Sequence, residues 1–136
     1  DDYVEIEPND TYQPLNSLSL SSRVYFSEYP EAGDKFQIID VSNYDPDRGY
    51  FLAVNESGNV VFRIAELDLE DYIISDILLI PDNWYNITAT YNGTHLSVYV
   101  GGQLTGQEST NIESIFYGIV IHDSCSTSTS AGLSVT

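Results

Sequence analysis

This 136-residue sequence lacks methionine and contains little cysteine and few basic residues. It has no methionine, so we expect a processed product or an excised piece, as removal of a signal peptide would give. Its single cysteine, Cys125, excludes an internal disulfide, a thiolate zinc site and a Cys-x-x-Cys redox pair. The longest apolar runs, such as Tyr50 to Val54 and Ile77 to Ile80, are far below the roughly 20 residues of a membrane-spanning helix. We therefore expect no membrane insertion.

Positive charge is scarce as well. Only 4 Lys and Arg stand against 21 Asp and Glu, which gives a formal net charge of -17. Such a field repels phosphate backbones and anionic lipid heads, so nucleic acid is excluded as a partner, whereas calcium, cationic partners or a high-salt medium suit it. Hydrophobic residues make up 42% of the chain, which is enough for a core. The length predicts one domain, residues 1–136.

Alternating apolar and polar residues predict an all-β fold, since no stretch has a convincing 3.6-residue period. Asn92-Gly93 lies between alternating segments at Ile87–Tyr91 and Leu96–Val100, which is a strong hairpin signal. Further hairpins are expected at Gly101-Gly102 and at Asn55–Asn59, and three hairpins in sequence predict an antiparallel meander. The strand count suits a two-sheet sandwich. Other strands are expected at Tyr3–Ile6, Leu18–Phe26, Phe36–Val41, Tyr50–Val54, Val60–Ile64, Ile73–Ile80, Ile115–Ile121 and Gly132–Val135.

The segment NWYNITATYNGTHLSVYVGGQL at Asn83–Leu104 resembles the laminin G-like and pentraxin-like group of concanavalin A-type lectin and glucanase folds. In that group a Trp opens a strand, a Tyr-x-Gly hairpin follows and a Tyr-Val-x-Gly closes the next hairpin. The resemblance implies an antiparallel two-sheet jelly-roll sandwich, and we place Trp84 in the core between its sheets. The matching residues are Trp84, Tyr91, Gly93, Tyr99, Val100 and Gly102.

The family's closing strand is shortened here to Ala131–Thr136. A shortened last strand leaves the neighbour of the first strand incomplete, which favours strand donation between subunits.

Four Asn-x-Ser/Thr sequons without proline in the middle favour an extracellular or cell-surface glycoprotein carrying N-glycans. A sequence rich in Asn, Ser and Thr also produces sequons by chance. The acceptors are Asn9, Asn55, Asn86 and Asn92. The Ser- and Thr-rich run at Ser124–Ser130 is interpreted as a solvated loop, with a polar edge strand or O-glycosylation as alternatives.

An acidic segment at residues 40–47 offers oxygen ligands of the kind that calcium prefers. Calcium-dependent ligand binding also occurs in the resembled family. The competing interpretation is a polar connection between strands, with a turn beginning at Asp45-Pro46. The candidate calcium ligands are Asp40, Asn43, Asp45 and Asp47, with Asp123 as a more distant addition.

Histidine gives no catalytic signal, because His95 and His122 are isolated in the sequence. The 11 tyrosines offer stacking platforms for sugars, although most fit half-buried strand positions. Tyr44 and Tyr85 are the ligand-binding candidates, with Tyr12 and Tyr29 as weaker ones.

The string Glu66-Leu67-Asp68-Leu69-Glu70 resembles the catalytic strand of laminarinase and agarase-type glycosidases. That resemblance implies Glu66 as nucleophile, Asp68 as its helper and Glu70 as acid/base. On one strand the three carboxylates share one face. An exposed acidic strand face is the alternative, favoured because the chain is short for such an enzyme.

Three functions follow from these observations. The first is a noncatalytic extracellular module for recognition or adhesion that binds a glycan or a surface protein, with calcium assistance. The second is a structural subunit of a fibre, pilus or surface layer that self-assembles into a homo-polymer by strand pairing. The third is a small retaining glycosidase that uses Glu66, Asp68 and Glu70.

Overall fold

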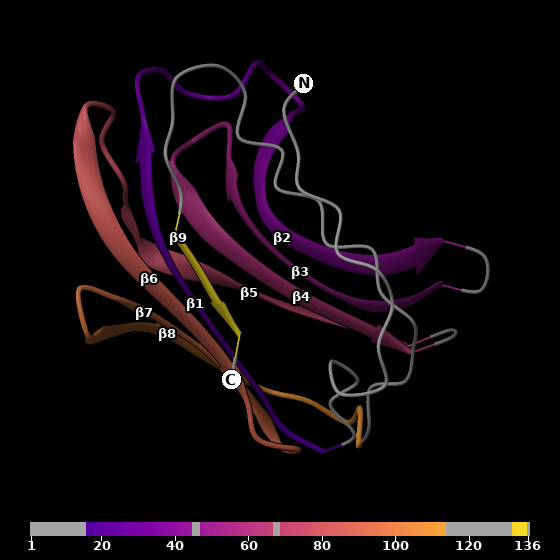
Figure 1. The fold of residues 1–136 in the computed structure, drawn as a ribbon. Coiled ribbons are helices and arrows are strands. Elements are labelled where there is room, and N and C mark those ends of the chain that lie inside the picture. The colour runs from indigo at the N-terminus through magenta and orange to yellow at the C-terminus, as the bar shows by residue number, and fades with distance from the viewer. Residues whose placement is uncertain (1–15, 45–46, 67–68, 114–131, 136) are drawn as a thin grey trace.

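The computed structural model describes residues 16–44, 47–66, 69–113 and 132–135, which form two antiparallel sheets packed face to face (Figure 1). The five-stranded sheet has the order β8-β7-β6-β1-β9, and the four-stranded sheet has the order β2-β3-β4-β5. The predicted all-β jelly-roll sandwich is confirmed. The strands are β1 (Leu18–Phe26), β2 (Lys35–Tyr44), β3 (Asp47–Asn55), β4 (Asn59–Glu66), β5 (Leu69–Leu78), β6 (Asn83–Tyr91), β7 (His95–Val100), β8 (Gln103–Ser109) and β9 (Gly132–Val135).

All three predicted hairpins form, but they do not make a single meander. The turn at residues 55–59 joins β3 to β4 in the four-stranded sheet, whereas the other two join β6 to β7 and β7 to β8 in the five-stranded sheet. Gly101 and Gly102 both have positive φ, 59° and 81°, as the two-residue turn between β7 and β8 requires. The chain therefore builds two meanders and changes sheet between β5 and β6.

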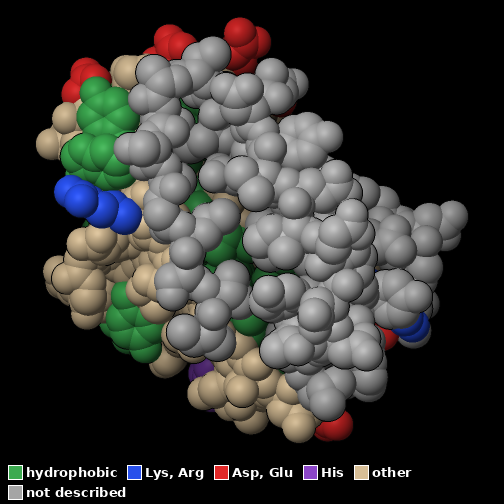
Figure 2. Space-filling view, viewed as in Figure 1, with side chains coloured by type: hydrophobic (Ala, Val, Ile, Leu, Met, Phe, Trp, Pro, Cys, Tyr) green, Lys and Arg blue, Asp and Glu red, His purple; other side chains and the backbone are tan. Residues whose placement is uncertain are grey.

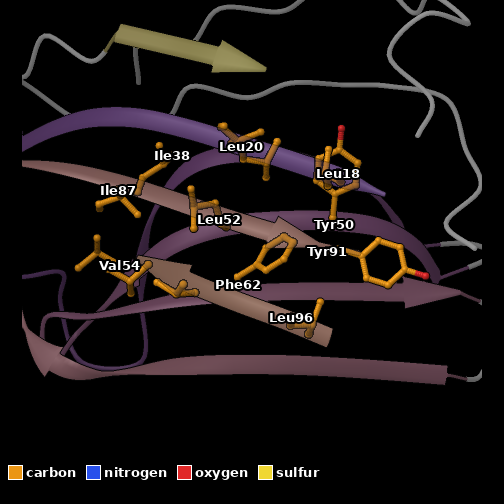
Figure 3. Close-up of a cluster of buried hydrophobic side chains, with 14 of the residues drawn as sticks. Leu18, Leu20, Ile38, Tyr50, Leu52, Val54, Phe62, Ile87, Tyr91 and Leu96 are labelled. Carbon is orange, nitrogen blue, oxygen red and sulfur yellow. The ribbon is translucent and has the colours of Figure 1, made fainter. Parts of the chain in front are cut away.

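Apolar side chains from both sheets meet in one core (Figure 3). Burial alternates along β1, where Leu18, Leu20, Val24 and Phe26 are buried, so this strand shows one face to the core and one to the outside. The phenol of Tyr50 lies inside the core, and its desolvation raises its pKa to about 12. Burial of this kind stabilises the fold roughly in proportion to the apolar area removed from water.

Trp84 does not lie in the core, so that prediction is wrong. In β6 the buried residues are Ile87, Ala89 and Tyr91, and successive strand residues point to opposite faces. Trp84 is two residues from Asn86 and four from Thr88, so its side chain lies on the same outward face of β6 as theirs. Trp84 is 44% exposed there.

The predicted closing strand forms as β9. It pairs antiparallel with β1 from Leu20↔Val135 to Arg23↔Gly132. The chain's own last strand therefore occupies part of the β1 edge at which we expected a strand from another subunit. The strands expected at residues 3–6 and 115–121 lie outside the described residues, as do Cys125 and the run at 124–130. Within the described part of the chain, no helix is long and apolar enough to cross a membrane.

Candidate functional site: an exposed aromatic surface

The outer face of β1 and β6 carries an aromatic and charged surface. Antiparallel pairing places Tyr25 opposite Trp84 and Arg23 opposite Asn86. We call these four residues together with Asp82, which precedes β6, the Trp84 surface. Figure 2 shows hydrophobic side chains beside basic ones on the left of the view, where the upper ends of β1 and β6 lie.

The indole of Trp84 contacts two side chains of β1. Its ring centroid lies 5.5 Å from that of Tyr25, with the planes tilted by 41°. The guanidinium carbon of Arg23 lies 4.7 Å from the Trp84 ring centroid. A cation over an aromatic face at this distance contributes about 0.5–1 kcal/mol at exposed sites. Among the described residues Arg23 makes no hydrogen bond or ion pair, so its N–H groups face solvent.

Asp82 fixes one end of this surface. Its backbone N–H donates to the Phe26 carbonyl at 2.8 Å, and its carboxylate accepts a 2.8 Å hydrogen bond from the Tyr25 hydroxyl. It is the one non-glycine residue in the described chain with positive φ, 62°. The hydrogen bond to the Asp82 carboxylate raises the pKa of Tyr25. The Tyr25 phenol is thus held as a donor to Asp82 beside the indole.

Polar groups continue from the aromatic pair along the same face. The Asn86 side chain is exposed, and the hydroxyls of Ser21 and Thr88 lie 3.2 Å apart on the paired strands. An exposed indole packs well against the C–H face of a sugar ring, while guanidinium, amide and hydroxyl groups beside it bind oxygen atoms. A guanidinium also binds a carboxylate through two parallel hydrogen bonds.

The predicted calcium residues do not form one open loop. Asp40 lies inside β2, is 5% exposed and accepts hydrogen bonds from Gln37 Nε2 at 2.8 Å and from the Ser42 N–H and hydroxyl. Because donors already occupy both of its oxygens, Asp40 does not fit a calcium ligand. Asn43 lies opposite Arg48, and Asp47 opposite Tyr44.

The side chains of Asn43, Asp45 and Asp47 lie outside the described set, so their calcium role stays a prediction. Among the described residues no group of three or more His, Cys, Asp or Glu side chains is arranged to hold a metal. The registered pairing up to Tyr44↔Asp47 agrees with the alternative interpretation of this segment as a connection between strands.

The two tyrosines predicted to bind a ligand, Tyr44 and Tyr85, do not belong to the Trp84 surface. The Tyr85 ring packs against the core, and its hydroxyl accepts from the Ile80 N–H at 2.9 Å and lies 3.2 Å from the Ile80 carbonyl. Its hydroxyl is therefore engaged with the backbone. Tyr44 ends β2, and its side chain is not among those described. Both assignments remain predictions.

The sequons differ in their local structure. Asn55 Oδ1 accepts from the Ser57 and Asn59 N–H groups, and Asn92 Oδ1 accepts from Thr94 and His95. These two acceptors lie in turns, as expected, whereas Asn86 lies within β6. Asn9 lies outside the described residues. The structure does not test the glycans, which stay a prediction.

The carboxylate string from Glu66 to Glu70 does not form one strand, so that expectation is wrong. Glu66 ends β4 and Leu69 begins β5, and the two residues are paired across the turn. Glu66 forms an ion pair with Arg48 at 3.2 Å, whereas Glu70 accepts from Arg63 Nε at 2.9 Å. Glu66 has the same strand parity as the core residue Ile64, whereas Glu70 lies opposite Ala65, which has the other parity. The two carboxylates therefore belong to opposite faces of the sheet. Asp68 lies outside the described residues.

A second aromatic and cationic group lies on the outer face of the four-stranded sheet. Lys35 Nζ lies 4.7 Å from the Phe51 ring centroid, and the guanidinium carbon of Arg63 lies 5.8 Å from it. We call Lys35, Phe51, Arg63 and Glu70 the Phe51 cluster. Phe51 is only 8% exposed, so the Phe51 cluster presents little aromatic surface to a ligand.

The two-sheet sandwich that carries these surfaces is the fold of a known class of domain. A sequence model of the concanavalin A-like lectin/glucanases superfamily matches residues 1–118. The chain therefore belongs to this superfamily, and it is a lectin-like jelly-roll domain. No curated protein sequence matches it.

Solved structures with this fold include several binding domains. The binding domain of Paraclostridial Mosquitocidal Protein 1 is 14% identical with a TM-score of 0.73 over 87% of this chain and 32% of its own. A botulinum neurotoxin type C structure, described by its interaction with two ganglioside molecules, is 16% identical with a TM-score of 0.67 over 98% of this chain and 34% of its own. This chain spans about a third of either protein's length.

A shorter neighbour is CBM40 of the Ruminococcus gnavus IT-sialidase, bound to α2,3 sialyllactose. It is 12% identical, with a TM-score of 0.68 over 90% of this chain and 76% of that one. At these identities the likeness shows the shared fold.

Sequence reasoning missed Arg23, Tyr25 and Asp82 as site residues. One signal was available: counting back in steps of two from Ile87, Ala89 and Tyr91 places Trp84 on the outer face. The pairing of β1 with β6, which brings Arg23 and Tyr25 to the indole, is a long-range contact that periodicity does not report.

Proposed function

We propose that this chain is a noncatalytic glycan-recognition module of an extracellular or cell-surface protein, and that it binds its ligand on the Trp84 surface. The observation that carries the proposal is the 44% exposed indole with the Arg23 guanidinium 4.7 Å from its ring centroid. An exposed large aromatic rimmed by polar groups is typical of a binding surface. The likeness to CBM40, bound to sialyllactose, and to the botulinum neurotoxin type C structure, described by its interaction with two ganglioside molecules, supports a glycan as the ligand.

The chemistry of Arg23 favours an acidic saccharide. The net charge of -17 repels anions at long range, but at physiological ionic strength exposed charges are screened beyond about 8 Å. A carboxylate in contact with a guanidinium is therefore governed mainly by that pair. Arg23 has no carboxylate partner among the described residues, which leaves it available for one on a ligand. Sialyllactose, the ligand in the CBM40 structure, is a suitable probe of this type.

Calorimetric titration of unglycosylated protein with sialyllactose and with neutral lactose tests the proposal. We expect Trp84→Ala to weaken sialyllactose binding at least tenfold, since a ring that stacks on a ligand contributes about 1.4 kcal/mol or more. Arg23→Gln should remove the preference for sialyllactose over lactose. Tyr72→Ala serves as a matched control, because Tyr72 is an exposed aromatic, 55%, on β5 and away from this surface. Unchanged binding by Trp84→Ala would refute the assignment.

The calcium assistance that we propose for this binding rests on Asn43, Asp45 and Asp47 without Asp40. The same titration with a chelator tests it: a loss of affinity that added calcium restores supports a calcium role. Equal affinity with and without the chelator contradicts it.

Self-assembly is a second candidate function, favoured by the exposed apolar side chains of β5. Tyr72, Ile74 and Leu78 are 55%, 42% and 58% exposed, and β5 ends the order of described strands in its sheet. An apolar edge strand is a site at which chains associate. Sedimentation velocity over a range of concentrations should show association that Ile74→Lys abolishes. A monomer at every concentration contradicts this function.

A further inference from the structure

One sequon acceptor lies inside the Trp84 surface. Trp84, Asn86 and Thr88 alternate with Tyr85 and Ile87, whose side chains pack toward the core, so the three share the outer face of β6. Same-face neighbours on a strand are about 7 Å apart. The carboxamide of Asn86 is exposed and makes no hydrogen bond in the described part of the chain. The exposed amide and the indole therefore belong to the same face of β6, two residues apart.

The contacts of Trp84 involve the strand positions opposite it and opposite Asn86. The indole contacts Tyr25, its direct cross-strand partner, and also Arg23, which lies opposite Asn86. Directly opposed side chains have Cβ atoms about 4.5–5.5 Å apart. Arg23 therefore connects the indole to the strand position opposite Asn86, and Trp84 and Asn86 are same-face neighbours on β6, a separation that a sugar attached to Asn86 can span.

The other described sequons lack this arrangement. Two residues before Asn55 stands Ala53, and two residues before Asn92 stands Thr90. The Oδ1 atoms of both asparagines accept backbone hydrogen bonds within their turns. Asn86 alone among the described acceptors has an aromatic residue on its own face at the preceding outward position.

We propose that Asn86 carries an N-glycan whose first sugar packs on Trp84, so that the Trp84 surface accepts a foreign ligand only in chains unmodified at Asn86. This inference rests on the proposed function for its second half. Attachment uses an activated lipid-linked oligosaccharide phosphate: the C1–O bond to phosphate breaks, a bond from C1 to Asn86 Nδ2 forms, the amide gives up one proton and the phosphate leaves with the electron pair. The sugar then covers apolar ring surface that would otherwise face water.

The test compares wild type with Thr88→Ala and Thr94→Ala, all produced in cells that perform N-glycosylation. Each variant removes one sequon without changing Asn86 or Trp84. Mass spectrometry of peptides reports occupancy, and the emission of Trp84, the single tryptophan, reports whether its ring is covered. Asn92 lies six residues from Asn86, about 20 Å along a strand, so Thr94→Ala is the matched control.

We expect full modification of Asn86 in wild type and in Thr94→Ala, with tryptophan emission at shorter wavelength than in Thr88→Ala. Sialyllactose should bind Thr88→Ala at least tenfold more tightly than wild type. Thr88→Val, which also removes the sequon and keeps a β-branched side chain on the strand, should repeat the result if Thr88→Ala folds poorly.

An unmodified Asn86, or the same emission with and without the glycan, overturns the inference. If the emission responds to the glycan but no variant binds sialyllactose or lactose, the proposed function fails while the packing of the glycan on Trp84 stands. If the glycan is present, covers Trp84 and leaves sialyllactose affinity unchanged, the control of access is wrong.

Discussion

The outer faces of the two sheets each pair an aromatic ring with a cation, yet they differ in what they leave exposed. On the five-stranded sheet Trp84 is 44% exposed, and Arg23 lies over it without an ion pair among the described residues. On the four-stranded sheet Phe51 is 8% exposed, and Arg63 is held by Glu70. The contrast separates the surface that we propose as the ligand site from a nearly buried cluster.

The physical reason lies in what each ring contacts. Phe51 has cationic side chains from two neighbouring strands near it, Lys35 and Arg63, whose aliphatic stems cover apolar surface while their charges stay near water. Trp84 stands near the start of β6, next to the Asp82 turn, and has β1 on one side. Both surfaces contain an aromatic ring and a cation, so residue type does not distinguish them. They differ in the exposure of the ring and in whether a carboxylate pairs with the cation.

The largest expected difference is in stability. Phe51→Ala should lower the free energy of unfolding by about 3 kcal/mol, because it removes a nearly buried ring. Trp84→Ala should cost about 1 kcal/mol, the value of exposed aromatic and cation–π contacts. Urea denaturation of both variants checks this, and equal losses would contradict the division into a structural and an exposed face.

High pH separates a core tyrosine from one on the Trp84 surface. Tyr50 has a pKa raised to about 12 in the folded state, above the ordinary value of about 10, so the folded state favours the neutral phenol. Its contribution to stability is complete below pH 10 and is lost as the pH rises from 10 to 12. Tyr50→Phe should flatten the fall in stability over that range.

Tyr25 provides the opposite case. Its pKa is also raised, by the hydrogen bond to Asp82, but its exposed ring should leave stability almost unchanged. Its ionisation should instead alter the emission of Trp84 above pH 10. A fluorescence titration of wild type and Tyr25→Phe tests this, and an identical high-pH response in both would disprove the coupling.

The smallest expected effect comes from the arginines. Arg63→Gln leaves Glu70 without its partner, but Glu70 is half exposed, so we expect a loss of about 1 kcal/mol and no change in sialyllactose affinity. Arg23→Gln should do the reverse: stability stays within about 0.5 kcal/mol and the affinity falls. Both readouts can be taken on the same preparations.

The strands were predictable where local chemistry sets them. Gly101-Gly102 and Asn92-Gly93 determine their hairpins through backbone conformation, and Leu18–Phe26 was predicted with the bounds that the structure has. The Glu66–Glu70 string was placed on one strand because it resembles a catalytic strand motif, whereas Glu66 and Leu69 belong to two paired strands. The assignment of Trp84 to the core was wrong because its order in the family pattern was followed in place of the inward and outward parity of β6.

The site required long-range information. Tyr25 and Trp84 are adjacent only because β1 pairs with β6, a strand far along the sequence. The periodicity of the sequence does not predict which strands pair or in which register. Asp40 also shows that the site needed long-range information. Its carboxylate looks like a free calcium ligand in the sequence, but in the sheet it accepts hydrogen bonds from Gln37 and Ser42.

The most direct test of the account is a titration of unglycosylated protein with sialyllactose, followed by the emission of Trp84, the single tryptophan. The account predicts a saturable change in emission that Arg23→Gln weakens and Phe51→Leu leaves unaltered. Binding measured by calorimetry with no change in Trp84 emission would place the ligand elsewhere and contradict it.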